Sequence, residues 1–95
     1  MSRYNVYLLP EAFEEEYEAY VWYKNQRENL GEEFLIELKK GVDKISANPN
    51  FYGFIDGKKV LRDYRIERFP YMIVYRIVAS SVEIVAIHHA KKDKK

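Results

Sequence analysis

The chain has 95 residues, of which 47% are apolar and 16% aromatic, a composition typical of a packed globule and not of a disordered segment. It has no cysteine, which excludes disulfides and thiolate metal sites, and no apolar run nears the roughly 20 residues that span a bilayer. The first strand pattern follows Met1 without a signal-peptide region, so we expect one cytoplasmic domain over residues 1–95.

Charge divides the chain into two halves of opposite sign. Residues 1–56 hold six Lys/Arg against eleven Asp/Glu, a net charge of −5, whereas residues 57–95 hold ten against four, a net charge of +6. The overall charge of +1 therefore hides a dipolar molecule. A basic C-terminal half indicates an anionic partner, and we expect function to lie there.

The chain opens with a short strand and an acidic helix. Residues 4–9 are β-branched and aromatic, and Pro10 ends this strand and opens the helix, where its missing N–H costs nothing. Glu11 and further glutamates in the first turns complement the helix dipole, and the helix should run to about Gln26. Its apolar face is expected to comprise Phe13, Tyr17, Tyr20 and Val21, widened by Ala12, Ala19 and Tyr23.

A second helix is predicted close behind the first. Asn29 and Glu32 have the spacing of a capping pair, and Asn48-Pro49 ends the helix. Its buried stripe is expected to be Phe34, Leu35, Leu38, Val42 and Ile45. Two amphipathic helices joined by a few residues indicate an antiparallel helical hairpin.

Three strands follow a loop at residues 50–58. The runs Val60–Glu67, Tyr71–Val78 and Val82–His89 have strand composition, and the turns between them are short enough to require antiparallel pairing. The first run is the most polar and is expected at an edge, with the other two in the centre. The order β-α-α-β-β-β predicts an α+β fold in which the helical hairpin packs on one face of a curved antiparallel sheet.

The two histidines do not form a metal site in this pattern. His88 and His89 are adjacent in a strand and so point to opposite faces, and no Asp/Glu cluster supplies further ligands. We therefore expect no metal and no cofactor. One imidazole could act as a general acid or base at the strand end. Alternatively, one packs under the helices and the other lies in solvent.

Four arginines of the last strands have two possible roles. Together with Tyr64, Tyr71 and Tyr75, a surface of guanidinium groups can bind phosphates or an acidic peptide. The arginines can also pair internally with Asp63 and Glu67, as exposed ion pairs that contribute little. Both roles stay open for Arg62, Arg65, Arg68 and Arg76.

Several segments, taken in order, resemble one family. The first strand ends in Pro10-Glu11-Ala12, the first helix holds Trp22-Tyr23, and the second opens on Leu30-Gly31-Glu32-Glu33-Phe34. The strongest segment is Phe69-Pro70-Tyr71 followed by Val74-Tyr75-Arg76 and by the ending His88-His89-Ala90-Lys91-Lys92. This ordered set, which covers nearly the whole chain, resembles the RelE/ParE superfamily of bacterial toxins from type II toxin–antitoxin systems, often labelled plasmid-stabilisation proteins.

The resemblance implies a toxin held inactive by a cognate antitoxin that wraps the basic sheet and the helices. RelE-like members cut messenger RNA in the ribosomal A site without a metal, with cationic side chains stabilising the charge that develops as the 2′-hydroxyl attacks. ParE-like members poison DNA gyrase. The surface for these partners is expected to comprise Arg62, Arg65, Arg68, Tyr71, Tyr75, Arg76, Lys91 and Lys92.

Met72 favours the ParE-like branch, because RelE-like members carry an arginine at the matching position. They also carry a tyrosine beyond the last strand, for which no residue matches here. We therefore expect a toxin that inhibits gyrase by binding, without catalysis. The alternative is a RelE-like, ribosome-dependent endoribonuclease, and its site would be Arg65, Arg76, His88, His89 and Lys92. A non-toxic interaction module and a homodimer also stay open.

Overall fold

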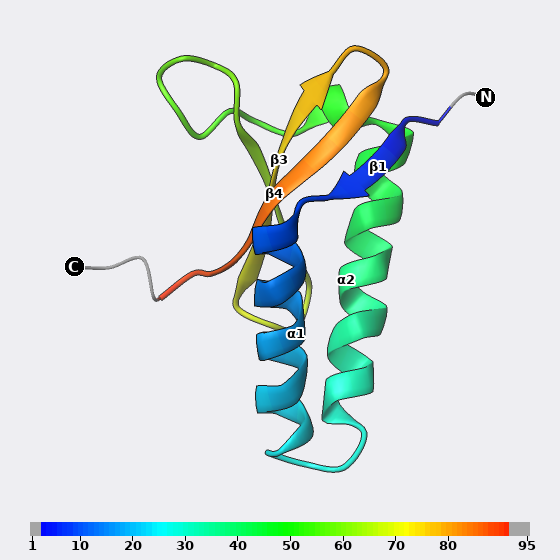
Figure 1. The fold of residues 1–95 in the computed structure, drawn as a ribbon, viewed down its shortest axis with the longest axis vertical. Helices are drawn as coiled ribbons and strands as arrows, with labels where there is room; N and C mark the ends of the chain where they lie inside the picture. The colour runs from blue at the N-terminus through cyan, green and yellow to red at the C-terminus, as the bar shows by residue number, and fades with distance from the viewer. Residues whose placement is uncertain (1–2, 92–95) are drawn as a thin grey trace.

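A computed structural model describes residues 3–91 and shows two helices packed against a four-stranded sheet (Figure 1). The elements in chain order are β1 (Asn5–Leu8), α1 (Pro10–Lys24), α2 (Leu30–Ala47), a 3-10 turn η1 (Pro49–Phe51), β2 (Arg62–Arg65), β3 (Tyr71–Val78) and β4 (Ser81–His89). Over the described range, neither helix combines the length and the apolar character that a membrane span needs.

The sheet has the strand order β1-β4-β3-β2. The pairs β2–β3 and β3–β4 are antiparallel, whereas β1 runs parallel to β4 from Asn5 opposite Ser81 to Leu8 opposite Ile84. The α+β fold and the order β-α-α-β-β-β are confirmed, with β2 at an edge and β3 and β4 in the centre. The sheet is mixed and not wholly antiparallel, because β1, which precedes the helical hairpin, lies beside β4 and runs parallel to it.

The core lies between the hairpin and one face of the sheet. Its largest fully buried side chains include Phe34 and Ile45 from α2 and Ile73, Tyr75 and Ile84 from the strands. Helix α2 comes unusually close to the sheet at Gly41, where a Cβ atom would lie 2.7 Å from Cε2 of Tyr64. The predicted stripe of α2 is confirmed, with Phe34, Leu38 and Ile45 buried and Leu35 and Val42 partly so.

The predicted apolar face of α1 is wrong in part. Phe13 and Tyr17 are each 60% exposed, while the buried positions of this helix are Ala12, Ala19 and Tyr23. The small alanines let α1 approach the sheet closely, so the buried stripe is centred on them and not on the larger rings. Phe13 and Tyr17 fall outside that stripe and face solvent.

The capping pair predicted for α2 does not form. Asn29 occupies the N-cap position, but its backbone is left-handed, with φ of 71°, and its side chain makes no capping hydrogen bond. Glu32 instead accepts a hydrogen bond from the Tyr20 hydroxyl at 3.2 Å, which joins the two helices near their connection. Glu32 thus helps to hold the hairpin together through Tyr20 and not through the predicted capping pair.

Strand β2 is shorter at both ends than the predicted run Val60–Glu67, and at its start residues 60 and 61 belong to the preceding loop. One carboxylate oxygen of Asp56 accepts the backbone N–H groups of Val60 and Leu61 at 3.0 and 3.1 Å. The N–H of Ile55 also donates to the carbonyl of Leu61 at 2.8 Å. These bonds close the loop on itself, so regular pairing with β3 begins only at Arg62.

Candidate functional site

The face of the sheet opposite the helices carries polar side chains in cross-strand rows. Ile73, Ile84 and Ile87 join the core, so by alternation their strand neighbours point away from the helices. One row of this open face is Arg65, Met72 and His88, and the row at its other end is Tyr7, Glu83 and Arg76. We call the surface formed by these six residues the open face.

Arg65 and Arg76 differ in how their charges are used. Arg76 lies opposite Glu83 and donates to its carboxylate from Nε at 2.8 Å, with a second guanidinium nitrogen at 2.7 Å. Arg65 is exposed and forms no ion pair with any residue from 3 to 91. An anionic partner would therefore meet Arg65 directly, but it would have to compete with Glu83 for Arg76.

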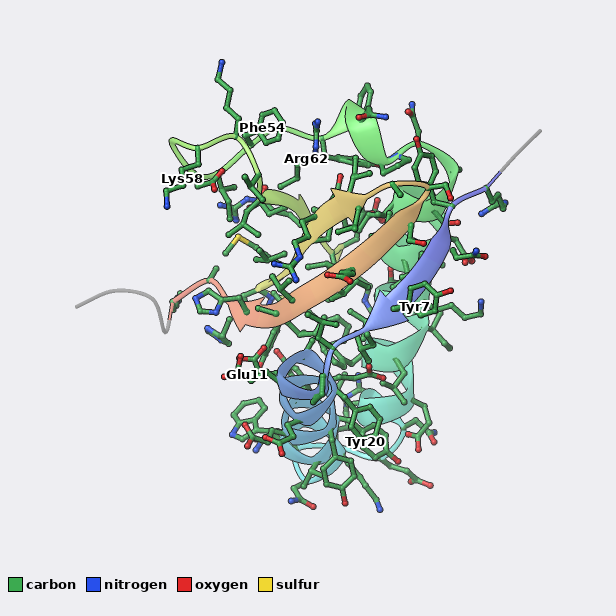
Figure 2. All side chains as sticks on the ribbon, turned by 45° about the horizontal axis from the view of Figure 1, so that its top comes forward. Tyr7, Glu11, Tyr20, Phe54, Lys58 and Arg62 are labelled. Atoms are coloured by element: carbon green, nitrogen blue, oxygen red, sulfur yellow. The ribbon has the colours of Figure 1, made fainter. Side chains whose placement is uncertain are left out.

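Arg62 holds the loop and does not lie on the open face. Its guanidinium donates to the carbonyls of Asn50 and Tyr52 at 3.1 and 2.6 Å. It also lies 3.9 Å from the centre of the Phe54 ring, and Figure 2 shows the two side chains together at the loop. These contacts fasten the 50–61 loop to the edge of the sheet, which is a structural role.

Arg68 joins the turn between β2 and β3 to helix α2. Its guanidinium lies 2.7 Å from the carboxylate of Glu33 and 3.9 Å from that of Glu37. The hydrogen bond from Arg68 holds the pKa of Glu33 below its usual value. Of the two roles left open for the arginines, internal pairing thus occurs for Arg68 and Arg76, through Glu33, Glu37 and Glu83 and not through Asp63 and Glu67.

Tyr75 was expected on the partner-binding surface, and its position contradicts this. The side chain is 0% exposed and its hydroxyl donates to the carbonyl of Pro49 at 2.6 Å. Burial raises the pKa of Tyr75 to about 12. The strand register places Tyr75 on the helix side of β3, so no partner docked on the folded chain reaches its side chain.

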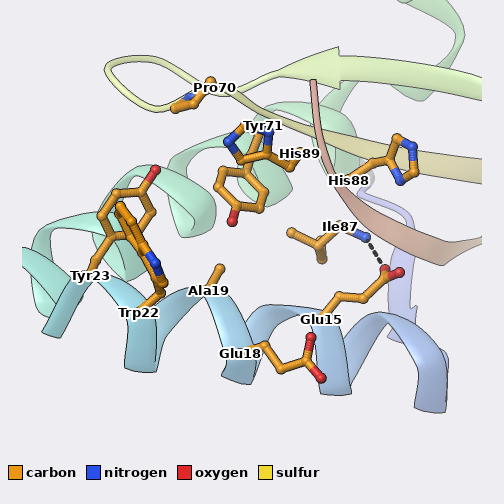
Figure 3. A pocket seen from close by; sticks show the side chains of 10 residues that line it. All are labelled: Glu15, Glu18, Ala19, Trp22, Tyr23, Pro70, Tyr71, Ile87, His88 and His89. Carbon is orange, nitrogen blue, oxygen red and sulfur yellow. Dashed lines mark hydrogen bonds between the residues drawn. The ribbon is translucent and has the colours of Figure 1, made fainter. Parts of the chain in front are cut away.

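The two histidines lie on opposite sides of β4, as alternation requires. His88 belongs to the open face beside Met72, whereas the ring of His89 packs edge-on against Tyr71 with the centroids 4.9 Å apart (Figure 3). His89 also accepts the N–H of Lys91 on Nδ1 at 3.0 Å. Among residues 3–91 no group of three His, Asp or Glu is arranged to hold a metal ion.

Only some of the residues expected for a nuclease site therefore lie on the same face of the sheet. Arg65, Arg76 and His88 share the open face, while His89 faces the other way. Met72 stands between Arg65 and His88 in their row. Lys91 is exposed just beyond β4, and Lys92, expected in both the nuclease and the partner surface, lies outside the described residues.

A hollow between α1 and the end of β4 was not predicted. Its volume is about 700 Å³, and its lining includes Glu15, Glu18, Trp22, Tyr23, Tyr71 and His89 (Figure 3). Tyr71 thus lies in this hollow and not on the open face. Periodicity could have suggested that Glu15, Glu18 and Trp22 share one side of α1, but the strand that faces them comes from the far end of the chain.

Comparison with known proteins identifies the class of the fold and then the family. The chain is similar to a solved structure titled "Chromosomal ParDE TA system from P. aeruginosa", with a TM-score of 0.81 and 14% identity over 93% of this chain and 97% of that chain. At this identity the likeness shows the shared RelE/ParE-type fold. A family model described as the ParE toxin of the type II toxin–antitoxin system, parDE, matches residues 6–94, so the chain belongs to the ParE toxin family. No curated protein sequence matches the chain significantly.

Proposed function

We propose that the protein inhibits DNA gyrase by binding and is neutralised by a cognate antitoxin that covers the open face. Membership of the ParE toxin family supports the general role. The observation that carries the choice of binding over catalysis is Met72. It occupies the centre of the row that holds Arg65 and His88, and a thioether cannot stabilise the charge of a phosphorane.

Growth and target assays test this function. Expression in bacteria should arrest growth, and co-expression with the neighbouring gene should relieve the arrest. Purified gyrase should accumulate cleaved DNA in the presence of the protein, while messenger RNA stays intact. Codon-positioned cuts in ribosome-bound message, lost in a His88→Ala chain, would instead establish the nuclease. Full growth at high soluble expression would leave a non-toxic interaction module.

Arg65 offers the sharpest test of where the antitoxin binds. Its guanidinium is exposed and has no ion pair with a described residue, so Arg65→Glu should weaken the complex at least tenfold, about 1.4 kcal/mol, with little effect on folding. Lys24→Glu, on α1, reverses the same charge away from the open face and serves as the control. Equal dissociation constants for the two variants, measured by calorimetry, would place the antitoxin elsewhere.

A further inference from the structure

The hollow between α1 and β4 has a continuous aromatic wall. Trp22 meets Tyr23 edge-on with centroids 5.0 Å apart, Tyr23 meets Tyr71 at 6.1 Å, and Tyr71 meets His89 at 4.9 Å. Trp22 is 57% exposed, an unusual cost for the largest apolar side chain of the protein. Four rings therefore line the hollow, with Trp22 the most exposed of them and Tyr23 largely buried behind it (Figure 3).

Two carboxylates stand on the α1 side of the same hollow. Neither Glu15 nor Glu18 pairs with a lysine or arginine within residues 3–91. Burial, the neighbouring Tyr23 and the charge of Glu18 together raise the pKa of Tyr71. The carboxylate of Glu18 therefore interacts electrostatically with Tyr71 on the other side of the hollow. No described lysine or arginine therefore neutralises the negative charge of these two glutamates.

An unpaired strand edge lies beside the hollow. Strand β1 pairs with β4 only as far as Leu8 opposite Ile84, so the last residues of β4 have no strand on that side. There the N–H of Ile87 donates to a carboxylate oxygen of Glu15 at 2.8 Å. Glu15 occupies the place that a carbonyl oxygen of an added strand would take, because such an oxygen accepts the same N–H in a sheet.

We propose that this hollow binds the cationic head of an arginine or lysine side chain carried by an extended segment of a partner protein. Aromatic faces attract a guanidinium or ammonium group within about 6 Å of their centres, and an unpaired carboxylate adds a charge-assisted hydrogen bond. The backbone of the same segment would lie along this edge of β4, where its carbonyl oxygen would have to replace Glu15 at the N–H of Ile87. Glu18 is exposed and forms no ion pair with a described residue, so a cation gains an attraction there that a neutral apolar side chain lacks. The site does not depend on which target the toxin inhibits.

The single tryptophan of the chain provides the readout. Titration with the peptide acetyl-Val-Arg-Val-amide should change Trp22 fluorescence to saturation. The same peptide with citrulline in place of arginine keeps the shape and removes the charge, and it should bind several-fold more weakly. Agmatine carries the guanidinium without a peptide backbone and should also bind more weakly. Citrulline or agmatine binding as tightly as the arginine peptide would overturn the proposal.

Matched variants separate the site from general charge effects. Glu18→Gln should weaken the arginine peptide about three- to fivefold, the range expected for one partly exposed charge pair. Glu14→Gln makes the same change on the exposed side of the same helix, away from the hollow, and should leave binding unchanged. Trp22→Leu, followed by calorimetry, should weaken binding further than Tyr17→Leu, which removes an exposed ring outside the hollow. The proposed site would be refuted if the two glutamate variants, or the two aromatic variants, weakened peptide binding equally.

Discussion

Replacing Tyr75 by phenylalanine removes one hydroxyl from the core and keeps the ring. That hydroxyl donates to the Pro49 carbonyl at 2.6 Å, and both side chains are fully buried. The loss comprises a net hydrogen bond of about 1 kcal/mol and part of the desolvation cost of the carbonyl left without a donor, so we expect a total of about 2 kcal/mol. In a chain of this length, this lowers the melting temperature by roughly 8–15 °C.

The same substitution has a signature at high pH. Burial raises the pKa of Tyr75 from its ordinary value of 10.0 to about 12, so the folded state keeps a proton that the unfolded state loses. The stability that the retained proton gives to the folded state is complete below pH 10 and is lost as the pH rises through about 12. Tyr75→Phe has no hydroxyl to deprotonate and cannot lose this stability. The difference in free energy of unfolding between the wild-type chain and the variant should therefore shrink by up to about 2 kcal/mol across that interval.

Urea unfolding at pH 8 and at intervals up to pH 12, followed by circular dichroism, measures both effects. Tyr7→Phe is the control, because Tyr7 is 54% exposed on β1 and its loss should change neither quantity. Wild-type stability at pH 8 for Tyr75→Phe would show that the hydroxyl contributes nothing to folding. If the wild-type and Tyr75→Phe chains lost stability in parallel above pH 10, the assignment of the raised pKa to Tyr75 would be refuted.

Three further substitutions probe how the helices and the loop are attached. Gly41→Ala should cost about 1–3 kcal/mol in urea unfolding, because the added methyl meets the Tyr64 ring at 2.7 Å, and wild-type stability would refute this contact. Arg68→Ala should be less stable than wild type at pH 7, and the gap should narrow as the pH falls below 4.5, since the lowered pKa of Glu33 gives stability that is lost on protonation; a gap that does not change with pH would contradict the pairing. Asp56→Ala should expose the 50–61 loop to limited proteolysis, because two backbone N–H groups lose their acceptor, and an unchanged cleavage rate would refute its role.

Local patterns in the sequence predict most of the fold but little of the site. Strand β3 begins and ends where its composition predicts, at Tyr71 and Val78, because flanking turns and apolar alternation are local signals. The predicted burial of Phe13 on α1 is wrong, since ring size suggests burial while the alanines decide how closely the helix packs. The parallel pairing of β1 depends on a partner far along the chain, which no local pattern encodes.

The arginines show the same limit for function. Their composition predicts a basic surface, but only register and packing show that Arg62 and Arg68 are used within the fold and that Arg65 remains available. Sequence alone also placed Tyr75 on the surface, because a tyrosine in a strand fits either face equally well. A one-residue irregularity between β3 and β4, at Val74 and Tyr75, further changes which β4 positions share a face.

The parallel pairing of β1 with β4 has a consequence for synthesis of the toxin. The residues that meet, Asn5 and Ser81, are among the first and the last that the ribosome adds to the described chain. Closing so long a loop is slow, and it cannot begin until β4 has emerged. A nascent chain therefore carries an unfinished sheet until β4 has emerged. The open face shares this order of events, because Tyr7 lies on β1 and His88 on β4, so the surface is complete only once the two distant strands have met.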